Sequence, residues 1–127
     1  MKIKCKIESG NKVWRNEKGQ IHRKKGPAKE YSNGDKEWYQ NGFLHRIDGP
    51  AIDCISGYKL WCQDNFRHRV DGPAEEYSNG DKYWWFEGEQ INCSSQEEFE
   101  KIIKNKTIVD NLVINIRDIK YKLVKID

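Results

Sequence analysis

The sequence predicts a mainly β protein in which stacked β-hairpin repeats form an elongated, twisted antiparallel sheet, with a C-terminal α-helix and a short β-strand cap. Three observations predict this fold: Trp recurs every 23 or 24 residues, and both His-Arg and Gly-Pro-Ala recur every 23 residues. Columns that repeat in one register indicate an array of structural repeats. The columns are Trp14, Trp38, Trp61 and Trp84; His22-Arg23, His45-Arg46 and His68-Arg69; and Gly26-Pro27-Ala28, Gly49-Pro50-Ala51 and Gly72-Pro73-Ala74.

The array begins and ends in partial copies. Gly10 precedes Trp14 at the same offset as Gly34 precedes Trp38, and the pattern stops after Gly88. A stack of identical units needs such half-repeats as caps. The predicted domains are the repeat array, 1–93, and a C-terminal helix and strand segment that packs on it, 94–127.

Each repeat has the features of a β-hairpin. Asn33-Gly34 tolerates the positive φ angles of a tight turn and is flanked by alternating aromatic segments. A two-residue turn there pairs Tyr31 with Lys36, whereas a three-residue turn with a bulge changes this register. A second turn is predicted at Asn41-Gly42, and Asp48-Gly49-Pro50 has the composition of a turn that carries the chain to the next hairpin. The four recurring Trp residues are then expected to form the hydrophobic spine of the sheet.

The end of the chain has a different character. Ser94-Ser95-Gln96-Glu97-Glu98 contains two overlapping capping boxes, and Phe99 and Ile102 follow at helical spacing. We therefore predict a helix at about 95–105. Residues 107–127 are rich in Ile and Val that alternate with polar residues, which predicts two short strands or one long bent strand. This segment is expected to cap the array, and a separate effector segment is the alternative.

Composition excludes several classes of protein. The 127 residues include 12% aromatic residues, too many for a disordered chain, and no apolar run is long enough to span a membrane. The first six residues lack the apolar stretch of a secretory signal. The cysteines form no Cys-x-x-Cys pair, which argues against a zinc site and a disulfide framework, so we expect no metal, no cofactor and a reducing cytoplasmic location. These cysteines are Cys5, Cys54, Cys62 and Cys93, of which Cys54 and Cys62 replace aromatic residues of the repeat.

Positive charge is concentrated in the first quarter of the chain. Residues 1–30 contain ten Lys or Arg against three Glu, whereas residues 31–127 contain thirteen Lys or Arg against seventeen acidic residues. A basic segment of this kind suits an acidic protein surface or a phosphate backbone. Alternatively, Lys2, Lys4 and Lys6 protect an exposed edge strand from aggregation.

The His-Arg pairs allow three interpretations. Histidine is a common acid–base catalyst, but a catalytic site needs dissimilar groups at one place, and here the same pair occurs once in each repeat. The pairs therefore form either a binding stripe or a structural device in which His and Arg hold the Asp-Gly-Pro corner, for example through Arg46 and Asp48. The candidate partner-binding residues of this row are His22, Arg23, His45, Arg46, His68 and Arg69.

A second group of candidates is aromatic. Because side chains alternate along a strand, the residues of Tyr83-Trp84-Trp85-Phe86 cannot all point into the core. The C-terminal helix then covers the outward side chains, or they remain exposed as anchors for a partner. The candidates for partner binding here are Tyr83, Trp85 and Phe86.

The repeat pattern resembles a known family. Gly-Pro-Ala, Asn-Gly-x-Lys-x-Trp and Asn-Gly-x-x-His-Arg, over about residues 7–92, are similar to the MORN-repeat variants of bacterial, phage and giant-virus proteins. The Ser-rich helix start and Glu98-Phe99 after the last Trp are similar to phage members. The resemblance implies β-hairpins stacked into an extended sheet, and non-enzymatic scaffolds that bind proteins or, for some members, membrane lipids.

Three functions follow from these observations. The first is a non-enzymatic protein-interaction module, one form of which is a phage-encoded inhibitor of a host defence or regulatory protein. The second is nucleic-acid or nucleotide binding through the basic first quarter and the His-Arg row. The third, an enzyme, has almost no support. An open sheet edge that carries Cys5 also permits a homodimer.

Overall fold

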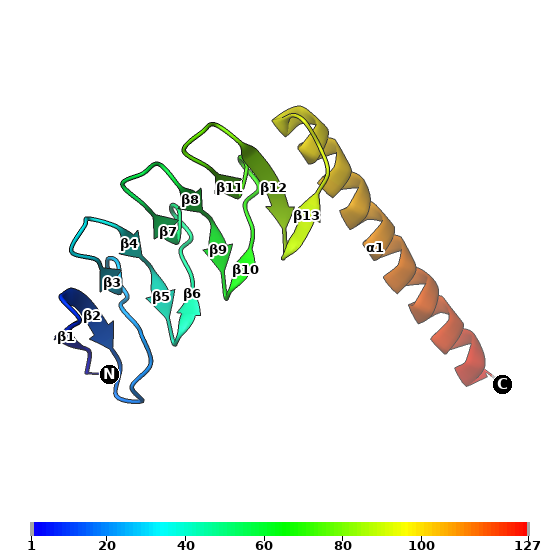
Figure 1. The fold of residues 1–127 in the computed structure, drawn as a ribbon. Helices are drawn as coiled ribbons and strands as arrows, with labels where there is room; N and C mark the ends of the chain where they lie inside the picture. Colours follow the sequence, from blue (N-terminus) through cyan, green and yellow to red (C-terminus); the bar gives the residue numbers. More distant parts are fainter. Residues whose placement is uncertain (1, 127) are drawn as a thin grey trace. The chain divides into compact units, whose positions relative to one another are not determined.

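The computed structural model describes residues 2–126, without the side chains of 114, 115 and 117–126. Residues divide into two compact units, Met1–Asn92 and Cys93–Asp127. The first unit is an antiparallel β-structure and the second is a single helix. The mainly β fold with a C-terminal helix, predicted from the repeats, is therefore confirmed (Figure 1).

Nine strands of the first unit form one antiparallel sheet in the order β1-β2-β3-β4-β7-β8-β11-β12-β13. Two further hairpins, β5-β6 and β9-β10, form separate two-stranded sheets. The strands are β1 (Lys4–Glu8), β2 (Asn11–Arg15), β3 (Lys29–Glu30), β4 (Lys36–Glu37), β5 (Tyr39–Gln40), β6 (Phe43–Leu44), β7 (Ile52–Asp53), β8 (Lys59–Leu60), β9 (Cys62–Gln63), β10 (Phe66–Arg67), β11 (Glu75–Glu76), β12 (Lys82–Phe86) and β13 (Glu89–Ile91).

The 23-residue period of the sequence is the period of the structure. β3 and β4 recur one repeat later as β7 and β8, and β5 and β6 recur as β9 and β10. Within the first unit, Figure 1 shows these hairpins following one another in a row. Each repeat therefore contributes two strands to the long sheet and one short hairpin beside it.

The Asn33-Gly34 turn has three residues rather than two. Glu30 pairs with Lys36, and the Tyr31 amide donates to the Asp35 carbonyl oxygen, so residues 32–34 form the turn. The two-residue register, which pairs Tyr31 with Lys36, is therefore wrong. Gly34 has a φ of 101°, a conformation that glycine adopts without a steric penalty.

The second turn has the predicted two residues. Gln40 pairs with Phe43, which leaves Asn41 and Gly42 as the turn, with φ angles of 51° and 83°. Positive φ at both central positions is the geometry of a type I′ hairpin, whose twist matches that of the flanking strands.

The alanines of Gly-Pro-Ala lie at the centre of the array. Ala28, Ala51 and Ala74 are each 0% exposed. Their carbonyl oxygens accept hydrogen bonds from the amides of Trp14, Trp38 and Trp61, at 2.9, 2.7 and 2.7 Å. A small side chain at this position lets consecutive repeats approach closely enough for these bonds.

Other buried side chains complete the core of the middle repeat. Leu60 and Cys62 pack with Ala51, and Ile52 and Leu44 lie partly buried against them. Burial raises the pKa of the Cys62 thiol to about 11. Cys62 is thus a small apolar core residue, at a position where the other repeats have an aromatic residue.

The second unit corrects one prediction. A single helix, α1 (Gln96–Ile126), begins at the predicted capping box and continues through the region where strands were expected. The prediction of strands within 107–127 is therefore wrong for residues 107–126, and Asp127 lies outside the described residues. Residues 94–127 contain no Gly or Pro, the two residues that interrupt a helix most strongly.

Candidate functional site

The guanidinium groups of the His-Arg row lie over the recurring Trp rings. Arg23 lies 4.0 Å from the centroid of Trp14, and Arg46 and Arg69 lie 3.8 Å from those of Trp38 and Trp61. At these distances a cation is attracted to the negative face of the indole ring. Each Arg thereby covers one Trp face and is held in place by it.

The same arginines hold the corner turns. Nη1 of Arg46 donates to the Pro50 carbonyl oxygen at 3.1 Å, and Nε donates to Asp48 Oδ1 at 3.1 Å. Equivalent bonds join Arg69 to Pro73 and Asp71, at 3.0 and 2.9 Å. In the first repeat Arg23 donates to Pro27 at 3.1 Å and has Glu30 as its acidic neighbour, at 3.6 Å.

The glycine of Gly-Pro-Ala makes room for this arrangement. A Cβ atom at Gly49 would lie 2.7 Å from Cζ of Arg46, and one at Gly72 would lie 2.6 Å from Cζ of Arg69. Because real Cβ atoms do not approach other atoms so closely, the His-Arg and Gly-Pro-Ala columns depend on each other.

The histidines hold a different element. Nδ1 of His22, His45 and His68 accepts a hydrogen bond from the backbone amide of Asn41, Asp64 and Glu87, at 2.9, 3.2 and 2.9 Å. Each of these hydrogen bonds joins the histidine of one repeat to the hairpin turn that lies 19 residues later in the chain. Sequence reasoning placed His at the Asp-Gly-Pro corner and missed this turn, although the 19-residue offset is the same in all three repeats.

Two grooves on the array are lined by this row. We call residues 24–27, 47–50 and 70–73 the corner loops. The first groove, with a volume of about 550 Å³, is lined by Arg23, Lys24, Lys25, Gly26, Trp38, Gln40, His45, Arg46, Ile47 and Asp48. The second groove, about 560 Å³, is lined by Arg46, Ile47, Asp48, Gly49, Pro50, Trp61, Gln63, His68, Arg69, Val70 and Asp71.

The lining residues of the two grooves are one repeat apart, with Pro50 as an additional residue in the second. Trp38, Gln40, His45 and Arg46 of the first groove correspond to Trp61, Gln63, His68 and Arg69 of the second. At the loop tips Ile47 is 77% exposed and Val70 is 51% exposed. The structure thus brings Arg23, His45 and Arg46 together in one groove and His68 and Arg69 together in the next, whereas His22 does not line either groove.

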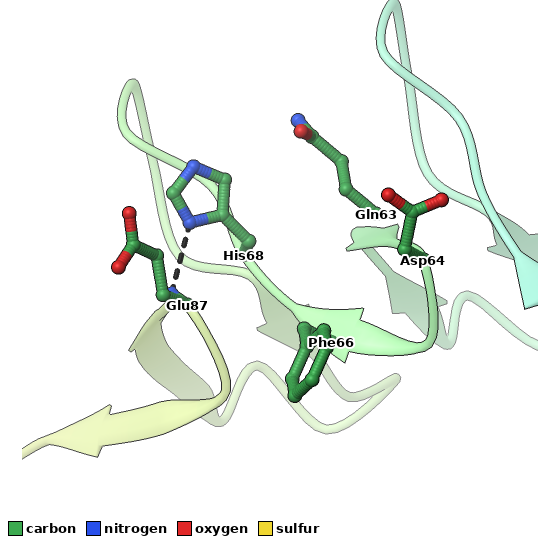
Figure 2. A pocket seen from close by; sticks show the side chains of 5 residues that line it. All are labelled: Gln63, Asp64, Phe66, His68 and Glu87. Carbon is green, nitrogen blue, oxygen red and sulfur yellow. Dashed lines mark hydrogen bonds between the residues drawn. The ribbon is translucent and has the colours of Figure 1, made fainter.

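A smaller pocket lies beside the second groove. Its volume is about 350 Å³, and Figure 2 shows its lining residues, with His68 beside Glu87 and Asp64 beside Gln63. The dashed line in Figure 2 is the bond from the Glu87 amide to His68 Nδ1. The ring of Phe86 contacts that of His68 at a tilted angle of 45°, with a centroid distance of 5.1 Å, so this candidate residue supports the imidazole.

The other two aromatic candidates, Tyr83 and Trp85, lie in a cluster around a buried carboxylate. Glu75 is 5% exposed, and its Oε1 accepts hydrogen bonds from Tyr77 at 2.7 Å and from Tyr58 at 3.1 Å. Its Oε2 accepts from Nε1 of Trp85 at 3.2 Å. The bond to Glu75 is the main cause that raises the pKa of Tyr77. Tyr83 meets Tyr77 edge to face at 5.8 Å.

The predicted spine residues occupy two kinds of environment. Trp84 is 8% exposed and belongs to the buried core. Trp14, Trp38 and Trp61 are half-buried, each with an arginine on its ring. The three fully buried alanines, which sequence reasoning did not select, were marked in the sequence only by their constant 23-residue spacing.

The described residues contain no group of three or more His, Cys, Asp or Glu side chains that could hold a metal ion. No helix within the described part of the chain has both the length and the apolar composition that crossing a bilayer requires. The described cysteines are all free thiols.

Comparison with protein-family models, with curated proteins and with solved structures gives no match for this chain. The resemblance to MORN repeats therefore stays a prediction from the repeat motifs themselves.

Proposed function

We propose that the chain is a protein-binding module that holds a segment of its partner across the two corner-loop grooves. One observation carries the proposal: the same groove is built twice, one repeat apart, with exposed apolar side chains at the loop tips. An exposed apolar residue that is surrounded by cationic and polar side chains in fixed positions is typical of the centre of a protein interface.

The charges of the grooves indicate the chemistry of the partner. Lys24 and Lys25 line the first groove at the positions that Ile47 and Asp48 occupy in the second. The first groove is therefore basic, and the second combines apolar and mixed-charge side chains. A partner segment with acidic residues near the first groove and apolar residues near the second fits this surface.

The rigidity of the groove walls favours binding. Each Arg is fixed by a Trp ring, a Pro carbonyl oxygen and an acidic side chain, so few rotamers are lost when a partner docks. Groups that are held before binding cost less entropy to order. The structural and the binding interpretations of the His-Arg row are thus compatible in this proposal.

Capture from a lysate with matched surface variants tests the proposal. The double variant Ile47→Asp/Val70→Asp places charges at both loop tips, and Ile55→Asp is the control, because Ile55 is 70% exposed and lines neither groove. We expect a stoichiometric protein on the wild-type and Ile55→Asp baits after nuclease treatment, and its loss from the double variant. Equal capture by all three baits contradicts the grooves as the binding site.

Nucleic-acid binding is the second candidate, and the cations of the first groove favour it. Against it, an arginine already covers one face of each of Trp14, Trp38 and Trp61, which limits stacking with bases. Asp48 and Asp71 at the corner loops add negative charge. If nuclease removes all captured material, and Lys24→Glu/Lys25→Glu abolishes oligonucleotide binding at low salt, this candidate replaces the first.

A further inference from the structure

The last repeat departs from the middle repeat at a set of interior positions. In the middle repeat these positions hold apolar residues or cysteine, and most of them pack in the core around Ala51. They are Leu44, Ile52, Cys54, Leu60 and Cys62. One repeat later the same positions hold a charge pair and three aromatic residues. These residues are Arg67, Glu75, Tyr77, Tyr83 and Trp85.

These five replacements meet at one place. With Gln90 they line a pocket of about 300 Å³. Tyr83 and Trp85 alternate with Trp84 along β12, so the pocket lies on the face of the sheet opposite to the Trp column. It is therefore separate from the corner-loop grooves, which the Trp column lines.

A charge pair whose carboxylate is buried has an energetic cost. Removing the Glu75 carboxylate from water costs several kcal/mol, and Arg67, whose side chain is 43% exposed, offsets this cost fully only if the geometry of the pair is excellent. Here Nε of Arg67 lies 3.8 Å from Glu75 Oε2, beyond hydrogen-bond distance, and this Nε is a buried atom with no hydrogen-bond partner among the described residues. Replacement by apolar residues, as in the preceding repeat, would avoid this cost.

The arrangement holds the arginine without neutralising its donors. The two oxygens of Glu75 already accept hydrogen bonds from Tyr58, Tyr77 and Trp85. Arg67 lies over the Trp85 ring at 4.9 Å, and its side chain is 43% exposed. A cationic ligand is disfavoured because the guanidinium already occupies the aromatic wall. The exposed part of the guanidinium can donate to an incoming oxyanion.

We propose that this pocket binds an oxyanion, a carboxylate or a phosphate group, through the guanidinium of Arg67. Tyr83 and Gln90 also line the pocket, and a tyrosine hydroxyl and a glutamine side-chain amide are further hydrogen-bond donors. Glu75 is a positioning residue that attracts the Arg67 guanidinium across 3.8 Å. The inference does not depend on the corner-loop grooves.

NMR titration of the intact protein tests the proposal. Acetate and inorganic phosphate are the two probes, each compared with chloride at equal ionic strength, and the indole N–H of Trp85 is the reporter because it bonds to Glu75. We expect one or both probes to shift this resonance with a saturable dependence, and the stronger probe identifies the oxyanion. Shifts no larger than those of chloride overturn the proposal.

Variants separate binding from structure. Arg67→Leu/Glu75→Ile carries the residues of the preceding repeat and removes both charges, so it is expected to fold and to bind the probe at least about tenfold more weakly. Its melting temperature is expected to fall, because Tyr58, Tyr77 and Trp85 lose the acceptor Glu75. Arg67→Lys keeps the charge but loses the planar fork, and is also expected to bind at least about tenfold more weakly.

The control is Arg15→Leu, because Arg15 has a similar exposure of 38% and lies outside the pocket. Its probe affinity is expected to equal that of the wild type. Probe binding by the Arg67 variants at the wild-type affinity, or a double variant that loses stability while the wild type binds neither probe, would mean that the charge pair is structural only.

Discussion

Arg46 illustrates how one residue serves packing and presentation together. Its guanidinium covers Trp38, donates to Pro50 and pairs with Asp48, which fixes the corner loop that carries Ile47. The planar fork of arginine makes these contacts simultaneously, and the point charge of lysine does not. The identity of this residue is therefore set by geometry rather than by charge alone.

Arg46→Lys is expected to lower the free energy of unfolding by about 2 kcal/mol, because the substitution keeps the charge but loses the bond to Pro50 and most of the contact with Trp38. Denaturant unfolding followed by Trp fluorescence measures the change. Lys59→Arg is the control, since Lys59 pairs with Asp53 at 3.1 Å through a single bond at a partly exposed site, and such pairs contribute little. Equal stability of the two variants would contradict a structural role for the row.

At this scale the sequence reveals the columns but not the partners. The Arg46–Asp48 pair could be predicted because the two residues are neighbours in sequence. The bond from the Asp64 amide to His45 could not, because its donor is a backbone group and carries no residue signature. The polar cluster around Glu75 was likewise missed, although it is visible when residues 67–85 are aligned with the preceding repeat.

The helix is the element where the prediction of secondary structure failed. Its start was predicted correctly, because Ser95 Oγ accepts a hydrogen bond from the Glu98 amide at 3.2 Å. Its length was not, because alternating Ile and Val residues were interpreted as strand. The same residues also fit helical spacing, with Val109, Leu112, Val113 and Ile116 three or four residues apart. The intrinsic cost of a β-branched residue in a helix is small, about 0.5 kcal/mol, so it does not end one.

Ser95→Ala is expected to destabilise α1 by about 1 kcal/mol, because it removes the side chain that accepts from the Glu98 amide. The far-ultraviolet circular dichroism of the helix, followed on heating, measures this loss. Ser95→Asp serves as the control, since an aspartate at the N-cap also accepts this bond. If both variants melt like the wild type, the helix does not begin at Ser95.

The Glu98 side chain is also part of this helix cap. The Ser94 amide and hydroxyl both donate to its Oε2, at 3.1 and 3.0 Å, and the bond from the amide is the main cause that lowers the pKa of this carboxyl. Because this pKa is lowered, the ionised Glu98 stabilises the folded state fully at a pH above the ordinary pKa of a glutamate. This stabilisation is lost as the pH falls through the folded-state pKa. The cap is therefore weakened in acid, in addition to any effect of Ser95.

At the scale of the whole array, stability is distributed along a row of similar units. Each repeat contacts mainly its neighbours, through the Trp-to-Ala amide bonds and the His-to-turn bonds. The period and the hairpin order could be predicted from the repeated columns, since they depend on local turn chemistry. The exact turn length at Asn33-Gly34 could not, because Asn-Gly suits both two- and three-residue turns.

Phenol groups spread over the array give it a common response to alkali. The pKa of Tyr31, Tyr39 and Tyr58 is raised to about 12, first by burial and then by neighbouring carboxylates. Tyr31 and Tyr39 donate to Glu37, and Tyr58 donates to Glu75. Ionisation would place a phenolate against a carboxylate in each case.

The array is therefore expected to lose stability between about pH 10 and 12. The folded state holds these protons more tightly than the unfolded chain, whose phenols titrate near their ordinary pKa of about 10. The stabilisation is fully present below about pH 10 and is lost as the pH rises through the folded value of about 12.

Tyrosinate absorbance and circular dichroism, recorded together during an alkaline titration, should change in the same window. Tyr31→Phe removes one phenol from the Glu37 network, so the rise in tyrosinate absorbance at high pH should be smaller in this variant than in the wild type. Titration of all phenols near pH 10 while the dichroism is unchanged would show that the carboxylate networks do not stabilise the array.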